Sequence, residues 1–290
     1  MKRNDFLAHV GWTGAGLAFV LGADGIIAPA AAASTHVDFI QISDSHIGFH
    51  GPAASDVAAT LAQTVQRINA LPVQPSFVIH TGDVTHLAKP EQFDAAHGIL
   101  ATLRAPLITI PGEHDVLGGD ANYRATFGTN DAPLGWKSWD QNGTHYIALV
   151  NVFDAETMGK LGTEQLDWLA KDLAGKPAST AIVVFGHVPL YAMYEPWGWT
   201  TEDGAKALAL LRRFDAVTIL NGHVHQVASH TDGNLRFWTA ASTAYPQPAP
   251  GTAERPGPLK VDPDRLLHVL GYRTVELTRG GVHVEDVDLA

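Results

Sequence analysis

The order of apolar and polar positions predicts strands and helices that alternate from residue 37 to residue 221. Short runs rich in β-branched residues are typical of buried strands, and they occur at 37–42, 77–80, 107–110, 146–150, 181–185 and 216–221. Apolar residues three and four apart predict helices at 56–70, 90–103, 163–173 and 203–214. We expect Asp56 and Thr163 to cap two of these helices, and Pro90 suits the first turn of another. This alternation predicts a layered α/β fold with a largely parallel sheet, either single or split into two packed sheets.

The C-terminal part of the chain lacks this alternation. Proline and glycine are dense at about 244–263, which predicts a long structureless crossing of the surface. Residues 271–288 have the pattern of a terminal hairpin that adds to a sheet edge. With no composition break after residue 34, we expect residues 34–290 to form one domain.

Acids and imidazoles follow the predicted strands at their carboxyl ends. These residues are Asp44, His46, Asp83, Glu113, His114, His187, His223 and His225. The carboxyl ends of strands in an open α/β sheet converge on one edge, so these side chains are expected to meet there. Charged groups placed together need a charged partner. Because they outnumber the four ligands of a closed zinc site, they suit two metal ions that share a bridging carboxylate.

Composition narrows the chemistry further. The chain has 19 basic and 30 acidic residues and a formal charge of −11, which argues against duplex nucleic acid as a partner. Cysteine is absent, so any metal site must use nitrogen and oxygen ligands.

The first residues have the pattern of an export signal over 1–33. A basic start is followed by a glycine-rich apolar stretch at 10–21 and by small residues at 28–33. The start resembles the twin-arginine motif, with Asn4 in place of the second arginine. This pattern predicts a periplasmic or secreted protein that begins near Ser34 and has no stable membrane partner after cleavage. The alternative is an uncleaved anchor, for which the apolar stretch is short.

Five motifs, in this order, resemble the blocks of the calcineurin-like metallophosphoesterases. They are Asp44-Ser45-His46, Gly82-Asp83, Gly112-Glu113-His114-Asp115, Gly186-His187 and Gly222-His223-Val224-His225. The resemblance spans about residues 36–226 and is nearest to the cyclic-nucleotide phosphodiesterase and purple acid phosphatase branches. It implies a four-layer α/β/β/α sandwich of two mixed sheets flanked by helices. It also implies hydrolysis of phosphomonoesters or phosphodiesters, cyclic nucleotides among them, by a metal-bound hydroxide.

The resemblance also implies a role for each residue. Asp44, His46 and His225 would hold the first metal and Asp83 would bridge, while Glu113, His187 and His223 would hold the second. His114 would protonate the leaving alkoxide, with Asp115 as its orienting partner.

Two positions depart from the family pattern. Asparagine is usual where this chain has Glu113. The extra negative charge either weakens the Lewis acidity of the site or favours a trivalent ion, and we expect the second outcome, iron(III) paired with manganese or zinc in the dinuclear centre. His86 lies three residues after Asp83, where purple acid phosphatases carry a ligating tyrosine. It is therefore a further candidate ligand, and the alternative is a residue that lines the pocket.

Aromatic residues follow His187 closely. Tyr191, Tyr194 and Trp197 are predicted to form a substrate-binding wall, and the alternative is a loop that packs on its own rings. Trp136 and Trp139 are further candidates for the wall, whereas His80 fits a buried core position better.

These inferences combine into one hypothesis, an exported two-metal phosphoesterase that acts on a small phosphorylated substrate. One alternative is a non-catalytic metal-binding scaffold of the same fold, against which the presence of His114 and of every metal block argues. Another is a structural or redox metal protein.

Overall fold

The computed structural model describes residues 19–21, 27–29, 37–129, 132, 135–153, 159–278 and 281–290. The chain divides into two compact units, Met1–His36 and Val37–Ala290. In the first unit, β1 (Phe19–Leu21) and β2 (Ile27–Pro29) pair antiparallel. The rest of the predicted export signal lies outside the described residues. Within the described ranges, no helix has both the length and the apolar character needed to cross a membrane.

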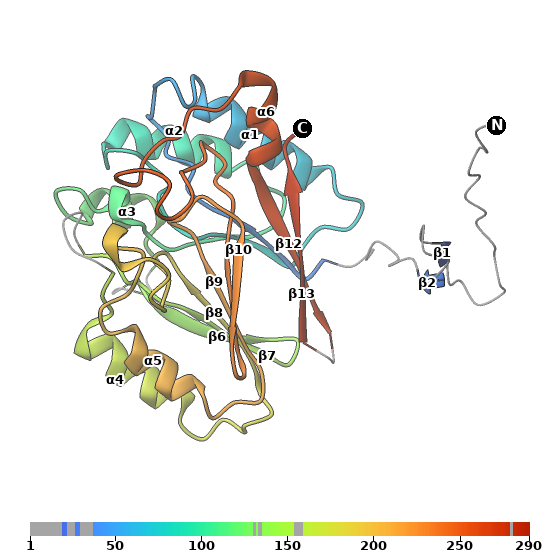
Figure 1. Ribbon diagram of the computed structural model, residues 1–290. Coiled ribbons are helices and arrows are strands. Elements are labelled where there is room, and N and C mark those ends of the chain that lie inside the picture. Colours follow the sequence, from blue (N-terminus) through green and yellow to red (C-terminus); the bar gives the residue numbers. More distant parts are fainter. Residues whose placement is uncertain are drawn as a thin grey trace. The chain divides into compact units, whose positions relative to one another are not determined.

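Two mixed sheets form the centre of the second unit (Figure 1). The six-stranded sheet has the order β10 (Ala228–Asp232), β11 (Leu235–Thr239), β9 (Val217–Asn221), β8 (Ala181–Gly186), β7 (Thr144–Ala148), β6 (Lys137–Gln141). The five-stranded sheet has the order β13 (Gly281–Asp288), β12 (Gly271–Thr278), β3 (Phe39–Ile42), β4 (Phe77–His80), β5 (Leu107–Thr109). Strands β11, β9, β8 and β7 are parallel to one another, as are β3, β4 and β5, and antiparallel strands complete the edges.

The two sheets pack face to face through large aromatic side chains. Phe39 of β3 stacks on Phe77 of the neighbouring strand β4 at 4.9 Å between ring centroids, and it meets Phe185 of β8 in the other sheet edge-on at 5.5 Å. Because side chains alternate across a strand, the neighbours Ile40 and Ile42 point to the opposite face. They join a separate buried cluster with the helices of that side.

Helices cover the outer face of each sheet. Leu61 and Val65 of α1 (Val57–Asn69) pack in the cluster of Ile40 and Ile42, together with Leu100 of α2 (Pro90–Leu100). The outer face of the six-stranded sheet packs on α4 (Gly162–Leu173) and α5 (Gly204–Leu211). The remaining helices are α3 (Ala121–Phe127), α6 (Pro263–Val269) and the short 3₁₀ turns η1 (Glu113–Asp115) and η2 (Glu195–Trp197). The predicted four-layer fold of two mixed sheets flanked by helices is therefore confirmed.

Local predictions at the helix ends are partly correct. The Asp56 carboxylate accepts a hydrogen bond from the Ala59 amide at 2.9 Å, and Pro90 is the first residue of α2. Thr163 does not cap α4. The Asp203 carboxylate takes that role, because it accepts from the Leu161 and Gly162 amides at 2.8 and 2.9 Å.

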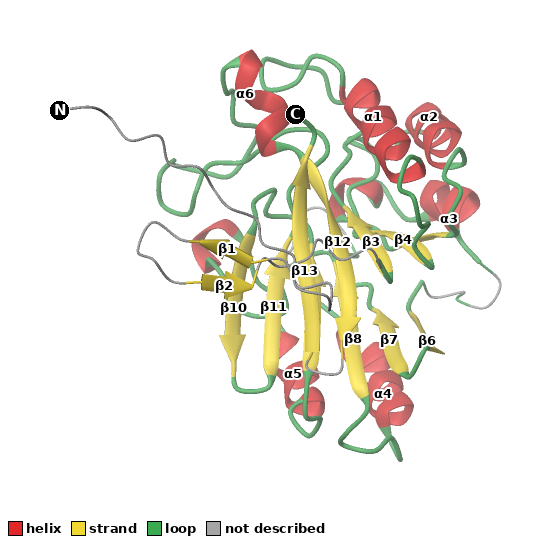
Figure 2. Ribbon diagram, turned by 90° about the vertical axis from the view of Figure 1, so that its right-hand side faces the viewer, coloured by secondary structure: helices red, strands yellow, loops and turns green. Residues whose placement is uncertain are grey.

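The C-terminal segments complete the sheet edge. Strands β12 and β13 pair antiparallel from Gly271↔Asp288 to Thr278↔Gly281, and β12 pairs with β3. Figure 2 shows the two long strands side by side. The proline-rich stretch does not begin on the surface as predicted, because Ala244 and Tyr245 are buried.

Candidate metal centre

The predicted ligand residues come together in loops that follow β3, β4, β5, β8 and β9. The first group is Asp44, His46, Asp83 and His225, each of which offers a ligand atom within 4.8 Å of the others. His46 Nε2 and His225 Nε2 lie 3.0 Å apart, and His225 Nε2 lies 3.3 Å from Asp44 Oδ1. These residues are almost fully buried.

The second group is Glu113, His187 and His223. One carboxylate oxygen of Glu113 lies 2.8 Å from His187 Nε2, and the other lies 2.8 Å from His223 Nδ1. Asp83 Oδ2 connects the two groups, because it is 3.5 Å from His46 Nε2 and 3.5 Å from His187 Nε2. One carboxylate oxygen thus faces a ligand nitrogen of each group, which is the arrangement that a bridging ligand needs.

The backbone is strained at this centre. Among the described non-glycine residues, positive φ angles occur at Asp44, His46, Asp83, His223, His225, Ala88 and Asn142. The first five are ligand candidates, with φ between 41° and 67°. Each such residue costs of order 1–3 kcal/mol and persists only where surrounding contacts impose it. The backbone conformation that points these side chains toward one another therefore lowers the stability of the fold.

Glycines allow the loops to approach closely. A Cβ atom at Gly112 would overlap the carboxylate of Asp83, and one at Gly222 would overlap the Ser43 side chain. Gly82 has φ 99° and leaves room for the His187 ring. Gly82, Gly112 and Gly222 are thus required by space, and Gly82 also by backbone conformation.

Backbone carbonyls orient three of the imidazoles. His187 Nδ1 donates to the Thr81 carbonyl at 2.7 Å, His225 Nδ1 to the Tyr245 carbonyl at 2.6 Å and His114 Nδ1 to the His86 carbonyl at 2.7 Å. A carbonyl oxygen only accepts, so each Nδ1 carries a proton. The other nitrogen, Nε2, is left to bind a cation or to transfer a proton.

The donor set fits metal ions. His187 Nε2, His223 Nδ1 and Glu113 Oε2 are buried polar atoms without a hydrogen-bond partner, although they approach one another. Buried polar groups are rarely left unpaired, and three that converge on one point are satisfied together by a cation. Nitrogen and oxygen donors of this kind suit iron, manganese or zinc.

Electrostatics keep the carboxylates ionised. Burial alone would raise the pKa of Asp44, but His225 and His187 outweigh it and hold this pKa at about 2. Burial is outweighed in the same way at Glu113, where His223 and His187 keep the pKa well below its usual range. Both groups are therefore anionic ligands at neutral pH.

The pKa values of two imidazoles, His46 and His187, are shifted in opposite directions. Burial, followed by the neighbouring His225, lowers the pKa of His46 well below its usual value. At His187 burial also acts to lower the pKa, but Asp83 and Glu113 outweigh it and raise this pKa well above the usual value. A cation that binds His187 Nε2 must displace a proton, so its binding depends on pH.

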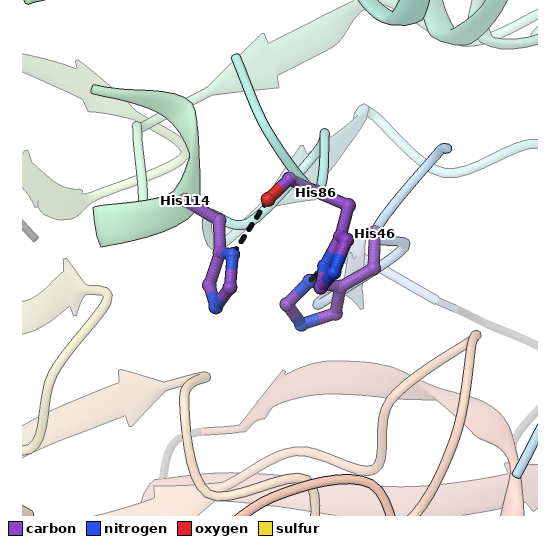
Figure 3. A group of neighbouring side chains, drawn as sticks. All are labelled: His46, His86 and His114. Atoms are coloured by element: carbon purple, nitrogen blue, oxygen red, sulfur yellow. Dashed lines mark hydrogen bonds between the residues drawn. The ribbon is translucent and has the colours of Figure 1, made fainter. Parts of the chain in front are cut away.

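His114 lies at the rim of both groups. Its backbone amide donates to Asp83 Oδ1 at 2.9 Å, and its ring lies edge-on to His46 with centroids 4.8 Å apart. Its ring also stacks on His86, with centroids 5.0 Å apart and planes 16° apart, and Figure 3 shows the bond from His114 to the His86 carbonyl. Burial acts to lower the pKa of His114, whereas Asp83 and Glu113 outweigh it and raise that pKa.

Asp115 does not orient His114, contrary to the prediction. Its buried carboxylate accepts from the amides of Val84, Thr85 and Gly112 at 3.0, 2.8 and 3.0 Å. It therefore fastens the β5 loop to the β4 loop. Burial and Asp83 raise the pKa of Asp115 to about 6 against these hydrogen bonds.

His86 joins His46 and His114 in a third group whose ligand atoms lie within 4.8 Å (Figure 3). Its Nδ1 lies 3.5 Å from the Nδ1 of His46. That nitrogen of His46 is on the opposite side of the ring from Nε2, which faces Asp83 and His225. His86 is thus placed behind His46 rather than among the first ligand group.

The predicted aromatic wall packs on itself and on the fold. Tyr191 stacks on His230 and contacts Phe237, at 5.0 and 4.7 Å between centroids, in the cluster that faces α4 and α5. Trp197 meets Tyr194 and the buried Trp199 edge-on, at 5.1 Å in each case. The alternative prediction, a loop stabilised by its own rings, describes these contacts.

Two other predicted positions are also core residues. Trp139 stacks on Tyr146 between the sheets at 5.2 Å. His80 is fully buried with Nε2 2.9 Å from the Ser45 hydroxyl, and burial lowers the pKa of His80 to about 4.

Residues 242–247 support the centre, although no sequence motif predicts this role. The Ser242 hydroxyl donates to the Asp44 carbonyl at 2.7 Å, and the Gln247 amide group donates to the His223 carbonyl at 3.0 Å. The segment also borders a cavity of about 800 Å³ that His225 lines. That volume is ample for a small organic ligand.

Comparison with known proteins gives a consistent result. Residues 37–227 match the family model described as calcineurin-like phosphoesterase. A glycerophosphodiester phosphodiesterase of Enterobacter lignolyticus is 27% identical over 221 residues, which cover 73% of this chain and 78% of that protein. A cAMP/cGMP dual specificity phosphodiesterase of Mycobacterium tuberculosis is 26% identical over 249 residues, which cover 79% of this chain and 77% of that protein. A dimetal phosphatase from Danio rerio has the same fold, with a TM-score of 0.65 and 12% identity over 87% of this chain and 96% of that chain.

Proposed function

Because the chain belongs to the calcineurin-like phosphoesterases and is a metal-dependent phosphoric ester hydrolase, we propose that it hydrolyses small phosphodiesters at a centre of two cations. The observation that carries this proposal is the position of Asp83 Oδ2, which lies 3.5 Å from a ligand nitrogen of each group. A single-cation site has no use for a carboxylate shared in this way.

The two ligand groups divide the cations between them. Asp44, His46 and His225 would hold the first, and Glu113, His187 and His223 the second, with Asp83 between them. When bound, two such cations polarise the phosphoryl oxygens and lower the pKa of a water molecule toward neutrality. We assign iron, together with manganese or zinc, because Glu113 adds a negative charge that a trivalent ion offsets.

His114 is the residue that we place at the leaving group. Its Nδ1 proton is held by the His86 carbonyl, so Nε2 is the atom that can give a proton to the departing alkoxide. The nearby carboxylates Asp83 and Glu113 favour the protonated ring over the opposing effect of burial, as the raised pKa indicates. As the P–O bond breaks, transfer of that proton yields a neutral alcohol, an effect typically worth 10²–10⁴-fold in rate.

Phosphodiesters are the favoured substrate class. The two relatives named above are phosphodiesterases, one for glycerophosphodiesters and one for cAMP and cGMP, and the match covers more than three quarters of each. Glycerophosphodiesters and cyclic nucleotides are accordingly the first substrates to test. Phosphomonoesters are the second class.

The N-terminal pattern supports a further proposal, that the enzyme is exported to the periplasm or the medium. Its support is the order of basic, apolar and small residues over 1–33. Expression with and without these residues, followed by cell fractionation, tests it. Equal recovery of both forms in the cytoplasm would contradict export.

A substrate panel tests the enzymatic proposal. Bis-p-nitrophenyl phosphate, p-nitrophenyl phosphate, cyclic AMP and a glycerophosphodiester are assayed with manganese or iron present. His114→Ala should lower kcat about a hundredfold or more and keep both cations. His283→Ala, at an exposed position on β13, is the matched control. Unchanged turnover in His114→Ala would remove the proposed proton donor, and no turnover on any substrate with both cations bound would favour the scaffold alternative.

A further inference from the structure

The chain returns to the metal centre after β11, beyond the five sequence motifs. As described above, residues 242–247 donate hydrogen bonds to the backbone carbonyls of Asp44 and His223. They also contact His46 and His225 through Tyr245. Four of the seven ligand candidates are thus in contact with one short segment. Three of the four belong to the first ligand group.

Tyr245 holds both imidazoles of that group. Its carbonyl accepts the His225 Nδ1 proton at 2.6 Å, which fixes the tautomer of His225. Its ring stacks on the His46 ring, with centroids 4.9 Å apart and planes 25° apart, and lies 4.8 Å from the His225 ring. Phe49 packs against the Tyr245 ring at 4.5 Å. With 3% exposure, Tyr245 is fixed in place by its surroundings.

Hydrogen bonds within the protein anchor the segment. The Ser242 hydroxyl accepts from the Ala244 and Tyr245 amides at 2.8 and 3.1 Å while it donates to the Asp44 carbonyl. The Thr243 amide donates to the Ser43 carbonyl at 3.1 Å. These hydrogen bonds fix the backbone of the segment, and the contacts with Phe49, His46 and His225 fix the Tyr245 ring.

The contacts of the Tyr245 side chain described above are with the first ligand group and not with the second. His187 of the second group is oriented by the Thr81 carbonyl, on the β4 loop, and the two oxygens of Glu113 each lie 2.8 Å from an imidazole nitrogen of that group. The link from the segment to the second group is the hydrogen bond from Gln247 to the His223 backbone, which does not involve the Tyr245 side chain.

We propose that Tyr245 is a positioning residue that sets the affinity of the first cation and leaves that of the second unchanged. The proposal rests on the dinuclear centre of the proposed function. Partners that orient metal-ligating histidines typically change metal affinity 10–100-fold. The carbonyl remains in every substitution of Tyr245, so the ring that fixes the plane of His46 is the part that mutation removes.

Three variants separate this role from general packing. Tyr245→Leu keeps an apolar side chain in the buried cluster and removes the aromatic plane. Tyr245→Phe keeps the plane and removes the hydroxyl, which makes no hydrogen bond within the described part of the chain. Tyr272→Leu is the matched control, because Tyr272 is buried in the same cluster and, in the described part of the chain, its ring does not stack on or hydrogen-bond to a ligand candidate.

The experiment is calorimetric titration of metal-free, full-length protein with Mn²⁺, and separately with Zn²⁺. Wild type, Tyr245→Phe and Tyr272→Leu should each bind two equivalents in the same two steps. Tyr245→Leu should bind one equivalent with unchanged affinity and the other about 10–100-fold more weakly. Rescue by phenylalanine identifies the ring plane as the cause.

Three results would overturn the proposal. They are two unchanged steps in Tyr245→Leu, equal weakening of both steps, and the same loss in Tyr272→Leu. Failure of the enzymatic proposal would look different, since the titration does not depend on turnover. A wild type that binds two cations and hydrolyses no ester would refute the phosphoesterase and leave the role of Tyr245 intact.

Discussion

Gly112→Ala probes how tightly the β4 and β5 loops meet at the shared carboxylate. The glycine precedes Glu113 and has an extended backbone, with φ −103° and ψ 177°, which any residue can adopt. The substitution therefore acts through steric overlap and not through backbone strain. An added Cβ would overlap Asp83 at its Oδ1 and backbone nitrogen atoms, and one of these loops must move.

The magnitude follows from that overlap. Forcing an extra methyl into a well-packed site costs about 1–3 kcal/mol. If the cations hold Asp83 in this position, the overlap destabilises the metal-bound state more than the metal-free state. Metal affinity then falls about fivefold to 150-fold. Both cations should be affected, because Asp83 faces both ligand groups.

Gly98→Ala is the control. Gly98 is exposed in the last turn of α2, and an added Cβ there meets nothing within 4 Å. Alanine is the better helix former by about 0.8–1.0 kcal/mol, so this variant should melt at a higher temperature and bind metal normally. Metal titration and thermal unfolding of both variants provide the assay. Wild-type affinity for both cations in Gly112→Ala would refute the shared position of Asp83.

Three more predictions concern single side chains. Glu113→Asn protein, purified without chelators, should contain less iron than the wild type, and identical, purely divalent metal content in both would refute the iron assignment. His86→Ala should keep both cations, because His86 Nδ1 faces Nδ1 of His46 and not the Nε2 atom that faces Asp83 and His225. Loss of one metal equivalent on metal analysis would show that His86 is a ligand. The buried His145 lies 2.7 Å from Asp172 and, against the effect of partial burial, lowers the pKa of that carboxyl. The stability that this pairing contributes is present above the ordinary carboxyl pKa of about 3.9 and is lost as the pH falls through the lower pKa of Asp172 in the folded protein. The melting temperatures of wild type and His145→Gln should therefore converge at acid pH. A constant difference across the pH range would contradict that pairing.

That the candidate ligand residues lie together could be predicted because each block is a local signal. A strand, a break and one or two ligand residues fall within about ten positions, and the parallel strands bring their carboxyl ends together. Asp44, Asp83 and His187 therefore meet although they are distant in sequence. The same logic places Glu113 and His223 in contact.

What could not be predicted depends on contacts between distant residues. Asp115 was expected beside His114, its neighbour in sequence, yet its carboxylate holds amides about 30 positions away. Asp203 caps a helix that begins 41 positions earlier. Tyr245 lies in a proline-rich stretch whose composition indicates only a surface loop. Its role comes from the rings and carbonyls that the fold places beside it.

Aromatic residues show a related limit. An aromatic side chain close to a ligand in sequence can face a pocket or fill a core, and composition does not distinguish the two. Tyr191 and Trp139 were both candidates for a substrate wall, and both pack in the interior layers. The short strand β10 was also missed, because it is mostly exposed and polar, with no alternating pattern.

Two cations that share Asp83 are expected to perform the hydrolysis. Metal-free enzyme loaded stepwise with Mn²⁺, with bound metal and turnover of bis-p-nitrophenyl phosphate measured at each step, tests it most directly. Turnover should rise as the second equivalent binds and should be absent without metal. Full turnover with one equivalent, or two bound equivalents without turnover, would contradict the claim.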